Sequence, residues 1–258
     1  MHYFNILMSL LLFNACGAQK NTPQFADNVV VAHRGAWKAE GFPENSIAAL
    51  KHAIALKCTG SEFDVHMTAD DVLVINHDAD HNGMLIAETS HEDLAAHKLS
   101  NGETLPTLRD YIIAGMEDNT STRLVCEIKP AETVERGQRM AEKAVALVKE
   151  LKAGDMTVYI SFMYEILQKI EELDPEAHTQ YLEGDKAPAT LKADGIDGAD
   201  YHFSVFKKHP EWIESAKKIG IALNAWTVNK PEDMDWLLEE DFDFITTNEP
   251  ELLLEKSK

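Results

Sequence analysis

The sequence has few basic residues, and they are not clustered. Its 258 residues include 24 Lys and Arg against 44 Asp and Glu, which gives a formal net charge of −20 at pH 7. Nucleic acids and anionic membrane surfaces are bound through concentrated positive charge. The charge balance therefore argues against either as the principal partner. An anionic ligand would have to be met by local positive groups, among which Arg34 and Lys129 stand out.

Cysteine is also scarce. Cys16, Cys58 and Cys126 are the three in the chain, which is too few for a disulfide framework. Cys58 and Cys126 lie in apolar stretches, so we expect buried free thiols, with a single disulfide as the alternative. The sequence also lacks a cluster of Cys and His that would indicate a structural zinc site.

The apolar run at the amino terminus, residues 4–13, is too short to span a bilayer but fits the central region of a secretory signal peptide. A small residue followed by Cys16 ends this run, as in a bacterial lipoprotein signal. We therefore predict a signal peptide over residues 1–16 with Cys16 as the lipidated cysteine, and a tether over residues 17–28. The protein is expected to be exported to the periplasm or cell surface. Simple cleaved secretion is the alternative to lipidation.

From residue 29 onward, the patterns of buried strands alternate with those of helices. Short, continuous apolar runs are typical of strands buried on both faces, and nearly all of them are followed by a helical pattern. Alternation of this kind predicts a parallel sheet, and eight units predict closure into a (β/α)8 TIM-type barrel, a single domain over residues 29–258. The expected strands begin at Val29, Ser61, Thr122, Thr157, Thr179, Gly198, Ile221 and Phe242.

The segment after the second expected strand does not follow this alternation. Residues 79–107 are polar and irregular, with Asn82-Gly83 and Asn101-Gly102 as turn signals. We predict a rim loop or small insertion here, with a short helix near residues 91–97. In a barrel of this type the site lies at the carboxyl ends of the strands, so the insertion is expected close to it.

Charged residues gather on or just beyond the first three expected strands. Side chains alternate along a strand, so Glu62 and Asp64 project from one face about 7 Å apart. Two carboxylates at that spacing repel unless a cation lies between them, and a hard divalent metal suits oxygen ligands. His77, which follows the next apolar run, is a candidate proton-transfer group.

Three residues near this region allow two interpretations each. His66 shares the face of Glu62 and Asp64, and we expect a hydrogen-bonded wall residue rather than a metal ligand. Asp78 either supports His77 or caps the loop. Trp37 either lines the pocket or packs under the first loop.

An ordered set of motifs is spread over almost the whole expected barrel. They are His33-Arg34-Gly35, Pro43-Glu44-Asn45-Ser46, Glu62-x-Asp64, His77-Asp78, Glu127-x-Lys129, Trp226-Thr227-Val228-Asn229 and Thr246-Thr247-Asn248-x-Pro250. This set resembles the glycerophosphodiester phosphodiesterase family. The chain departs from the family pattern in three places: Asp71 replaces a glycine, the residues after Asp78 differ from the family's most common ones, and Asn248 replaces an aspartate.

The resemblance implies a hydrolase that uses one divalent cation, Mg²⁺ or Ca²⁺, to cleave a phosphodiester into a phosphomonoester and an alcohol. By the family pattern Glu62, Asp64 and Glu127 hold the cation. His33 and His77 form the acid/base pair, and either histidine can take either role. The resemblance further implies that Arg34 and Lys129 contact the phosphate. Glu44 and Asn45 either orient the loop after the first strand or touch the substrate, and Trp226 forms part of the glycerol-side wall.

The expected substrate is a small-molecule glycerophosphodiester, cleaved to glycerol 3-phosphate and an alcohol. One alternative keeps the chemistry but acts on a lysophospholipid, a glycerophosphoinositol or a cell-wall phosphodiester. Another is a noncatalytic, lipid-anchored binding module, against which the paired histidines argue because such a module needs no proton-transfer groups. The membrane is expected as a partner only through the lipid anchor at Cys16, and the oligomeric state stays open.

Overall fold

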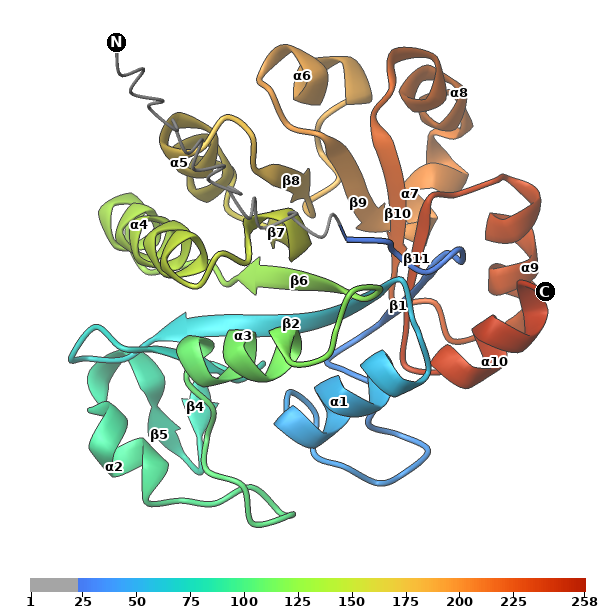
Figure 1. The fold of residues 1–258 in the computed structure, drawn as a ribbon. Helices are drawn as coiled ribbons and strands as arrows, with labels where there is room; N and C mark the ends of the chain where they lie inside the picture. Colours follow the sequence, from blue (N-terminus) through green and yellow to red (C-terminus); the bar gives the residue numbers. More distant parts are fainter. Residues whose placement is uncertain (1–22) are drawn as a thin grey trace, which may run out of the picture.

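The computed structural model describes residues 23–258, so the predicted signal peptide and Cys16 lie outside it. Eight parallel strands form a closed ring with helices packed around them (Figure 1). The ring closes because β1 (Val30–Ala32) pairs with both β2 (Gly60–Met67) and β11 (Phe244–Thr247). The predicted single-domain (β/α)8 barrel is therefore confirmed.

The remaining barrel strands follow in chain order, and each coincides closely with an expected one. They are β6 (Arg123–Ile128), β7 (Thr157–Ser161), β8 (His178–Tyr181), β9 (Gly198–His202) and β10 (Ala222–Trp226). The surrounding helices are α1 (Ile47–Ala55), α3 (Leu108–Met116), α4 (Val134–Glu150), α5 (Tyr164–Leu173), α6 (Pro188–Ala193), α8 (Pro210–Ile219), α9 (Pro231–Glu239) and α10 (Pro250–Lys256).

Local sequence signals explain where several of these helices begin. The hydroxyl of Ser46 accepts the backbone N–H of Ala49 and so caps α1, and threonines cap α3 and α4 in the same way. Proline opens α6, α8, α9 and α10, where its missing N–H costs nothing. The short helix α7 (Phe203–Lys208) is not predicted by the sequence, because it follows β9 directly without a loop.

The predicted rim insertion is confirmed, and it has structure of its own beside α3 (Figure 1). It begins after β3 (Leu73–Ile75), which pairs antiparallel with β2, and contains the hairpin of β4 (Asp80–His81) and β5 (Met84–Leu85) and the helix α2 (His91–Ala95). The Glu103 carboxylate accepts the first N–H groups of α1, a favourable place for negative charge. A small apolar cluster anchors the insertion: Val74, Ile86, Leu94 and Leu105.

Cys58 and Cys126 are buried free thiols, as expected. Within the predicted tether, the backbone N–H groups of Gln24 and Ala26 donate to the carbonyls of Thr120 and Ser121, so this part packs on the barrel. Across residues 23–258, we find no helix with the length and apolar character needed to cross a membrane.

Gly35, in the turn after β1, is held to glycine by both its backbone and its surroundings. Its φ is +80°, and a Cβ there would lie 2.7 Å from the backbone carbon of Ala49. We expect Gly35→Ala to lower the free energy of unfolding by about 3 kcal/mol or more, through a left-handed backbone penalty plus overpacking. Gly41→Ala is the matched control, because Gly41 has φ +69° but open space around it.

Gly41→Ala should cost about 1 kcal/mol, the backbone penalty alone. Urea unfolding of both variants measures the difference. Equal losses would contradict the close packing of the first loop on α1.

Candidate active site

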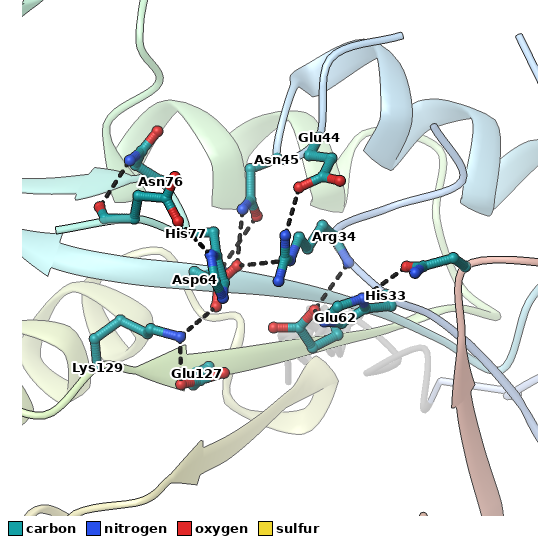
Figure 2. Close-up of polar contacts among 12 residues, drawn as sticks. His33, Arg34, Glu44, Asn45, Glu62, Asp64, Asn76, His77, Glu127 and Lys129 are labelled. Carbon is teal, nitrogen blue, oxygen red and sulfur yellow. Dashed lines mark hydrogen bonds and ion pairs between the residues drawn. The ribbon is translucent and has the colours of Figure 1, made fainter. Parts of the chain in front are cut away.

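A pocket of about 130 Å³ opens at the carboxyl ends of the barrel strands. Figure 2 shows its charged side chains converging from the ends of β1, β2 and β6. Active sites of such barrels occupy this end, so the pocket is the candidate site. Its lining residues are His33, Arg34, Glu62, His77, Glu127, Lys129, Ile160, Phe162, Leu182, Asp200, Trp226, Thr227 and Thr246.

The turn after β1 carries Arg34 in an uncommon backbone conformation, with φ +57°. Its backbone N–H donates to Glu62 Oε2 over 2.8 Å, which holds the turn against the strand that bears the carboxylates. Its guanidinium donates to the Glu44 carboxylate over 2.5 Å, and Nε lies 3.7 Å from Asp64. These contacts over-determine a sparsely populated conformation, as is common where a side chain is held for function.

Asn45 binds the buried carboxylate of Asp64. Its Nδ2 donates to Asp64 Oδ2 over 2.8 Å, and its Oδ1 accepts the backbone N–H of Asp64. Asn45 has φ +61°, a conformation that asparagine tolerates better than most residues. Two roles were expected for Glu44 and Asn45: orienting the loop or touching the substrate. Their contacts with Arg34 and Asp64, respectively, are those of residues that orient the loop.

Three carboxylates form a buried cluster on β2 and β6 (Figure 2). Strand alternation turns Glu62 and Asp64 inward, and the parallel register places Asp64 beside Glu127. One oxygen from each of the three lies within 4.8 Å of the others. Lys129 Nζ lies 3.1 Å from Asp64 and 2.8 Å from Glu127. The predicted acidic cluster is present, and its three carboxylates lie close enough together to hold a metal ion.

Burial and repulsion make this cluster unfavourable by itself. Burial, and then the charges of Asp64 and Glu127, raise the pKa of Glu62 well above its ordinary value. Burial and Asp64 likewise raise the pKa of Glu127 to about 7. Burial also works against ionisation of Asp64, but Lys129 and then Asn45 outweigh it and hold the pKa of Asp64 below its ordinary value.

The donor set fits a hard divalent cation. All three side chains offer oxygen, and Glu62 Oε1 is buried with no hydrogen-bond partner within residues 23–258. A cation bound there would relieve the repulsion and satisfy that oxygen. His66 is not part of the cluster: its Nε2 lies 3.2 Å from the carbonyl of His77, as expected for a wall residue.

His33 is held in one orientation by two asparagines. Its Nδ1 lies 2.7 Å from Asn248 Oδ1, an acceptor, so Nδ1 carries the proton. Asn248 is fixed in turn because its backbone N–H donates to Asn229 Oδ1. Nε2 of His33 is left free and lies 3.9 Å from Glu62 Oε2. Burial, and then the neighbouring Arg34 charge, lower the pKa of His33 to about 4, so the ring is neutral at pH 7.

His77 stands on the opposite side of the carboxylates and is more exposed. Its Nδ1 lies 2.8 Å from the Asp78 carboxylate, which supports the first interpretation of Asp78. The amide of Asn76 donates to the carbonyls of Asp78 and Asp80 and so shapes this loop. Nε2 of His77 is therefore the nitrogen available to a ligand.

Trp226 borders the pocket at the end of β10, as the family pattern implies. Its indole N–H donates to the backbone carbonyl of Asp200, and its ring packs edge-on against Phe162 with centroids 5.4 Å apart. Trp37 is not among the residues that line this pocket.

The sequence did not assign roles to Asn229, Asn248, Asp200, Phe162 or Leu182. Asn229 and Asn248 stand inside the matching motifs, but only the structure shows that they support His33. The other three are inward residues near the ends of β7 to β9. The sequence signal for them is the alternation of inward and outward side chains along these strands.

The depressed pKa of His33 predicts a pH-dependent stability of the metal-free protein. Between about pH 6.5 and pH 4 the unfolded chain takes up a proton on this histidine while the folded protein does not, so stability falls as the pH falls. We expect the wild type to lose about 2 kcal/mol more than His33→Asn between pH 7 and pH 4.5. Urea unfolding at several pH values measures this.

The comparison with His33→Asn is needed because Glu62 and Glu127, with raised pKa values, act in the opposite direction in both proteins. Parallel stability profiles for the two proteins would contradict the buried, neutral state of His33.

Fold and site together are those of a (β/α)8-barrel enzyme with a charged pocket at the carboxyl ends of its strands. The sequence model of the glycerophosphoryl diester phosphodiesterase family matches residues 33–252. The chain therefore belongs to the glycerophosphoryl diester phosphodiesterase family, and as a member of it is a phosphoric diester hydrolase.

Individual relatives agree with this assignment. The chain is 39% identical to a glycerophosphodiester phosphodiesterase from Parabacteroides distasonis, whose crystal structure matches with a TM-score of 0.87 over 90% of this chain and 98% of that one. It is 28% identical over 242 residues to the glycerophosphodiester phosphodiesterase of Caldanaerobacter subterraneus, covering 88% of this chain and 96% of the relative. A phosphodiesterase of Oleispira antarctica, in complex with its product sn-glycerol-3-phosphate, shares the fold at 24% identity with a TM-score of 0.77, over 88% of this chain and 95% of that one.

Proposed function

We propose that this protein hydrolyses glycerophosphodiesters to glycerol 3-phosphate and an alcohol, using one divalent cation and two histidines. The observation that carries the proposal is a buried cluster of three carboxylates, two of which, Glu62 and Glu127, line one pocket together with Arg34, Lys129, His33 and His77. A pocket that only bound its ligand would not need two imidazoles on opposite sides of a carboxylate cluster.

Glu62, Asp64 and Glu127 would hold the cation, which is Mg²⁺ or Ca²⁺ because all the donors are oxygens. When bound, such a cation supplies positive charge to a nonbridging phosphate oxygen and so favours the transition state. Without it, negative charge on the three carboxyl groups offsets the positive charge of Arg34 and Lys129 and would weaken their attraction for a phosphodiester anion.

Arg34 and Lys129 are the phosphate-binding groups in this proposal. Arg34 offers a planar fork of donors, and the contact with Glu44 fixes the position of its guanidinium. Lys129 offers a compact charge that already lies against Asp64 and Glu127, next to where the phosphate would bind. Both side chains are mostly buried, which strengthens their attraction for an anion.

The two histidines differ in a way that suggests their roles. His33 is neutral with Nε2 unprotonated, as required of a general base that takes the proton from the attacking hydroxyl. His77, with its Nδ1 on the Asp78 carboxylate, would protonate the leaving oxygen through Nε2. The attacking hydroxyl is either water or a neighbouring hydroxyl of the substrate, and the same base serves both.

A panel of phosphodiesters tests this function. Purified protein with Mg²⁺ or Ca²⁺ should release the alcohol and glycerol 3-phosphate from glycerophosphocholine and glycerophosphoethanolamine. We expect lower activity on a lysophospholipid, a glycerophosphoinositol and a cell-wall phosphodiester. Preference for one of these three would move the substrate while keeping the chemistry. No cleavage of any member of the panel would favour the binding module.

Export to the periplasm or cell surface, with a lipid anchor on Cys16, stays a prediction from the sequence, because residues 1–22 lie outside the described part of the chain.

A further inference from the structure

One side of the pocket carries almost no charge. Ile160, Phe162, Leu182 and Trp226 form an apolar wall at the ends of β7, β8 and β10. Asp200 on β9 lies within this wall, only 1% exposed, and lines the same pocket. A buried carboxyl among aromatic and aliphatic side chains is expensive and needs an explanation.

Among residues 23–258, no side chain pairs with the carboxyl group of Asp200. Its Oδ1 is buried and makes no hydrogen bond, and the part of the chain that the structure describes provides no ion pair for it. Burial, and then the like charge of Glu127, raise the pKa of Asp200 well above its usual range. The carboxyl group of Asp200 therefore stabilises the fold through no hydrogen bond or ion pair among the described residues.

The polar residues beside Asp200 satisfy one another and leave it out. Asn224 is its neighbour in the β9–β10 register, but the Asn224 amide donates to Gln180 over 3.3 Å and its oxygen accepts from Thr246 over 3.2 Å. Gly198, the next inward position on β9, has no side chain, and Gln180 fills its space.

The backbone of Asp200, in contrast, is engaged in building the pocket. Its carbonyl accepts the indole N–H of Trp226 over 2.9 Å, which fixes the ring that borders the apolar wall. Asp200 thus orients Trp226 through its backbone and leaves its side chain available to a ligand in the pocket.

The position of Asp200 within the barrel indicates which part of a ligand it meets. The ring order places β9 directly across from β2, with three strands between them on either side. Because β2 carries Glu62 and Asp64, Asp200 lies opposite the expected phosphate position. A group that reaches Asp200 therefore belongs to one of the two substituents of the phosphate and not to the phosphate itself.

We propose that Asp200 is a substrate-recognition residue, whose carboxyl oxygen accepts a hydrogen bond from the terminal hydroxyl of the glycerol unit. This inference rests on the proposed function, since it assumes that the phosphate binds at the carboxylate cluster. It makes the enzyme selective for phosphodiesters of a polyol over those of a simple alcohol. A site with an otherwise unpaired buried acceptor rejects ligands that lack the matching hydroxyl.

Calorimetric binding with Mg²⁺ present tests this without requiring turnover. The ligand pair is glycerol 3-phosphate and propane-1,2-diol 1-phosphate, which lacks only the terminal hydroxyl. Wild-type protein should bind glycerol 3-phosphate at least about 10-fold more tightly. Asp200→Leu should bind both ligands with affinities within about 2-fold of each other, whereas Asp200→Asn, which keeps a carbonyl acceptor of the same shape, should retain the preference.

Equal binding of the two ligands by the wild type would overturn the proposal, whether or not the variants fold. Retention of the full preference by Asp200→Leu would also overturn it. Loss of the preference in Asp200→Asn would show that an ionised carboxylate is needed, as for a cationic substrate group, and would equally contradict the hydroxyl assignment. If the wild type binds as expected but cleaves no diester, the proposed function fails while the role of Asp200 stands.

Discussion

We expect His33→Ala and His77→Ala each to reduce kcat for glycerophosphodiester hydrolysis by about 10²- to 10⁴-fold, the usual contribution of a positioned acid or base. In the proposed mechanism Nε2 of His33 takes a proton from the attacking hydroxyl and Nε2 of His77 gives one to the leaving oxygen, so each substitution removes a separate proton transfer. The measurement is kcat and KM of purified variants on glycerophosphocholine, because removing a proton-transfer group lowers kcat far more than it changes KM.

His178→Ala is the matched control for these two variants. His178 begins β8 at the opposite end of the barrel and pairs with Asp197 on the surface. Its activity should stay within about 2-fold of the wild type, as for most surface substitutions. Thermal unfolding of all three variants checks that the fold is intact. Near-normal hydrolysis by His33→Ala or His77→Ala would remove that histidine from the mechanism.

Glu62→Gln and Asp64→Asn should abolish binding of the divalent cation and lower kcat/KM by at least about 10²-fold, since charge stabilisation by a metal is worth several kcal/mol. Titration calorimetry with Mg²⁺ and Ca²⁺ measures the binding. The metal-free Glu62→Gln protein should also be more stable than the wild type, because the substitution removes a carboxylate whose pKa burial and two neighbouring charges have raised. A gain in stability with a loss of function is typical of a site residue.

Glu214→Gln on the surface of α8 is the control for charge alone, and it should change neither cation binding nor turnover. Wild-type affinity for the cation in both Glu62→Gln and Asp64→Asn would contradict the three-carboxylate site.

The architecture of this protein is largely readable from its sequence. Parallel strands buried on both faces appear as short apolar runs. Most helices begin with proline or follow a serine or threonine cap. The order and the extent of most strands and helices can therefore be predicted. The helix α7 escaped prediction because Phe203–Lys208 has no loop before it and only His202 as its cap. In the rim insertion the sequence predicted the short helix α2 but not the hairpin of β4 and β5, because its strands are only two residues long.

The charged half of the site was also predictable: period-two alternation places Glu62 and Asp64 on one face of a strand, and the family resemblance adds Glu127. The supports of the site were not. Asn248 contacts His33 although the two residues are 215 positions apart in the sequence, and no local pattern encodes that contact. Asp200 was missed because its role depends on the absence of partners, which only the packing reveals.

The departures from the family pattern now have structural interpretations. Asp71 adopts φ +64°, so it fits the turn that a glycine would otherwise fill, and its carboxylate pairs with Arg139 on α4. Asn248 gives His33 a neutral acceptor where an aspartate would give a charged one, which is consistent with the low pKa of His33. Neither change removes a ligand or a proton-transfer group.

Phosphorus NMR of glycerophosphocholine incubated with the wild-type protein tests the central claim most directly. After exhaustive chelation we predict that the diester resonance stays unchanged. Addition of Mg²⁺ or Ca²⁺ to the same sample should convert it to the resonance of glycerol 3-phosphate, either directly or through a transient cyclic diester. Undiminished conversion in the chelated sample, or no conversion after the cation is restored, would contradict a cation-dependent phosphodiesterase built on Glu62, Asp64 and Glu127.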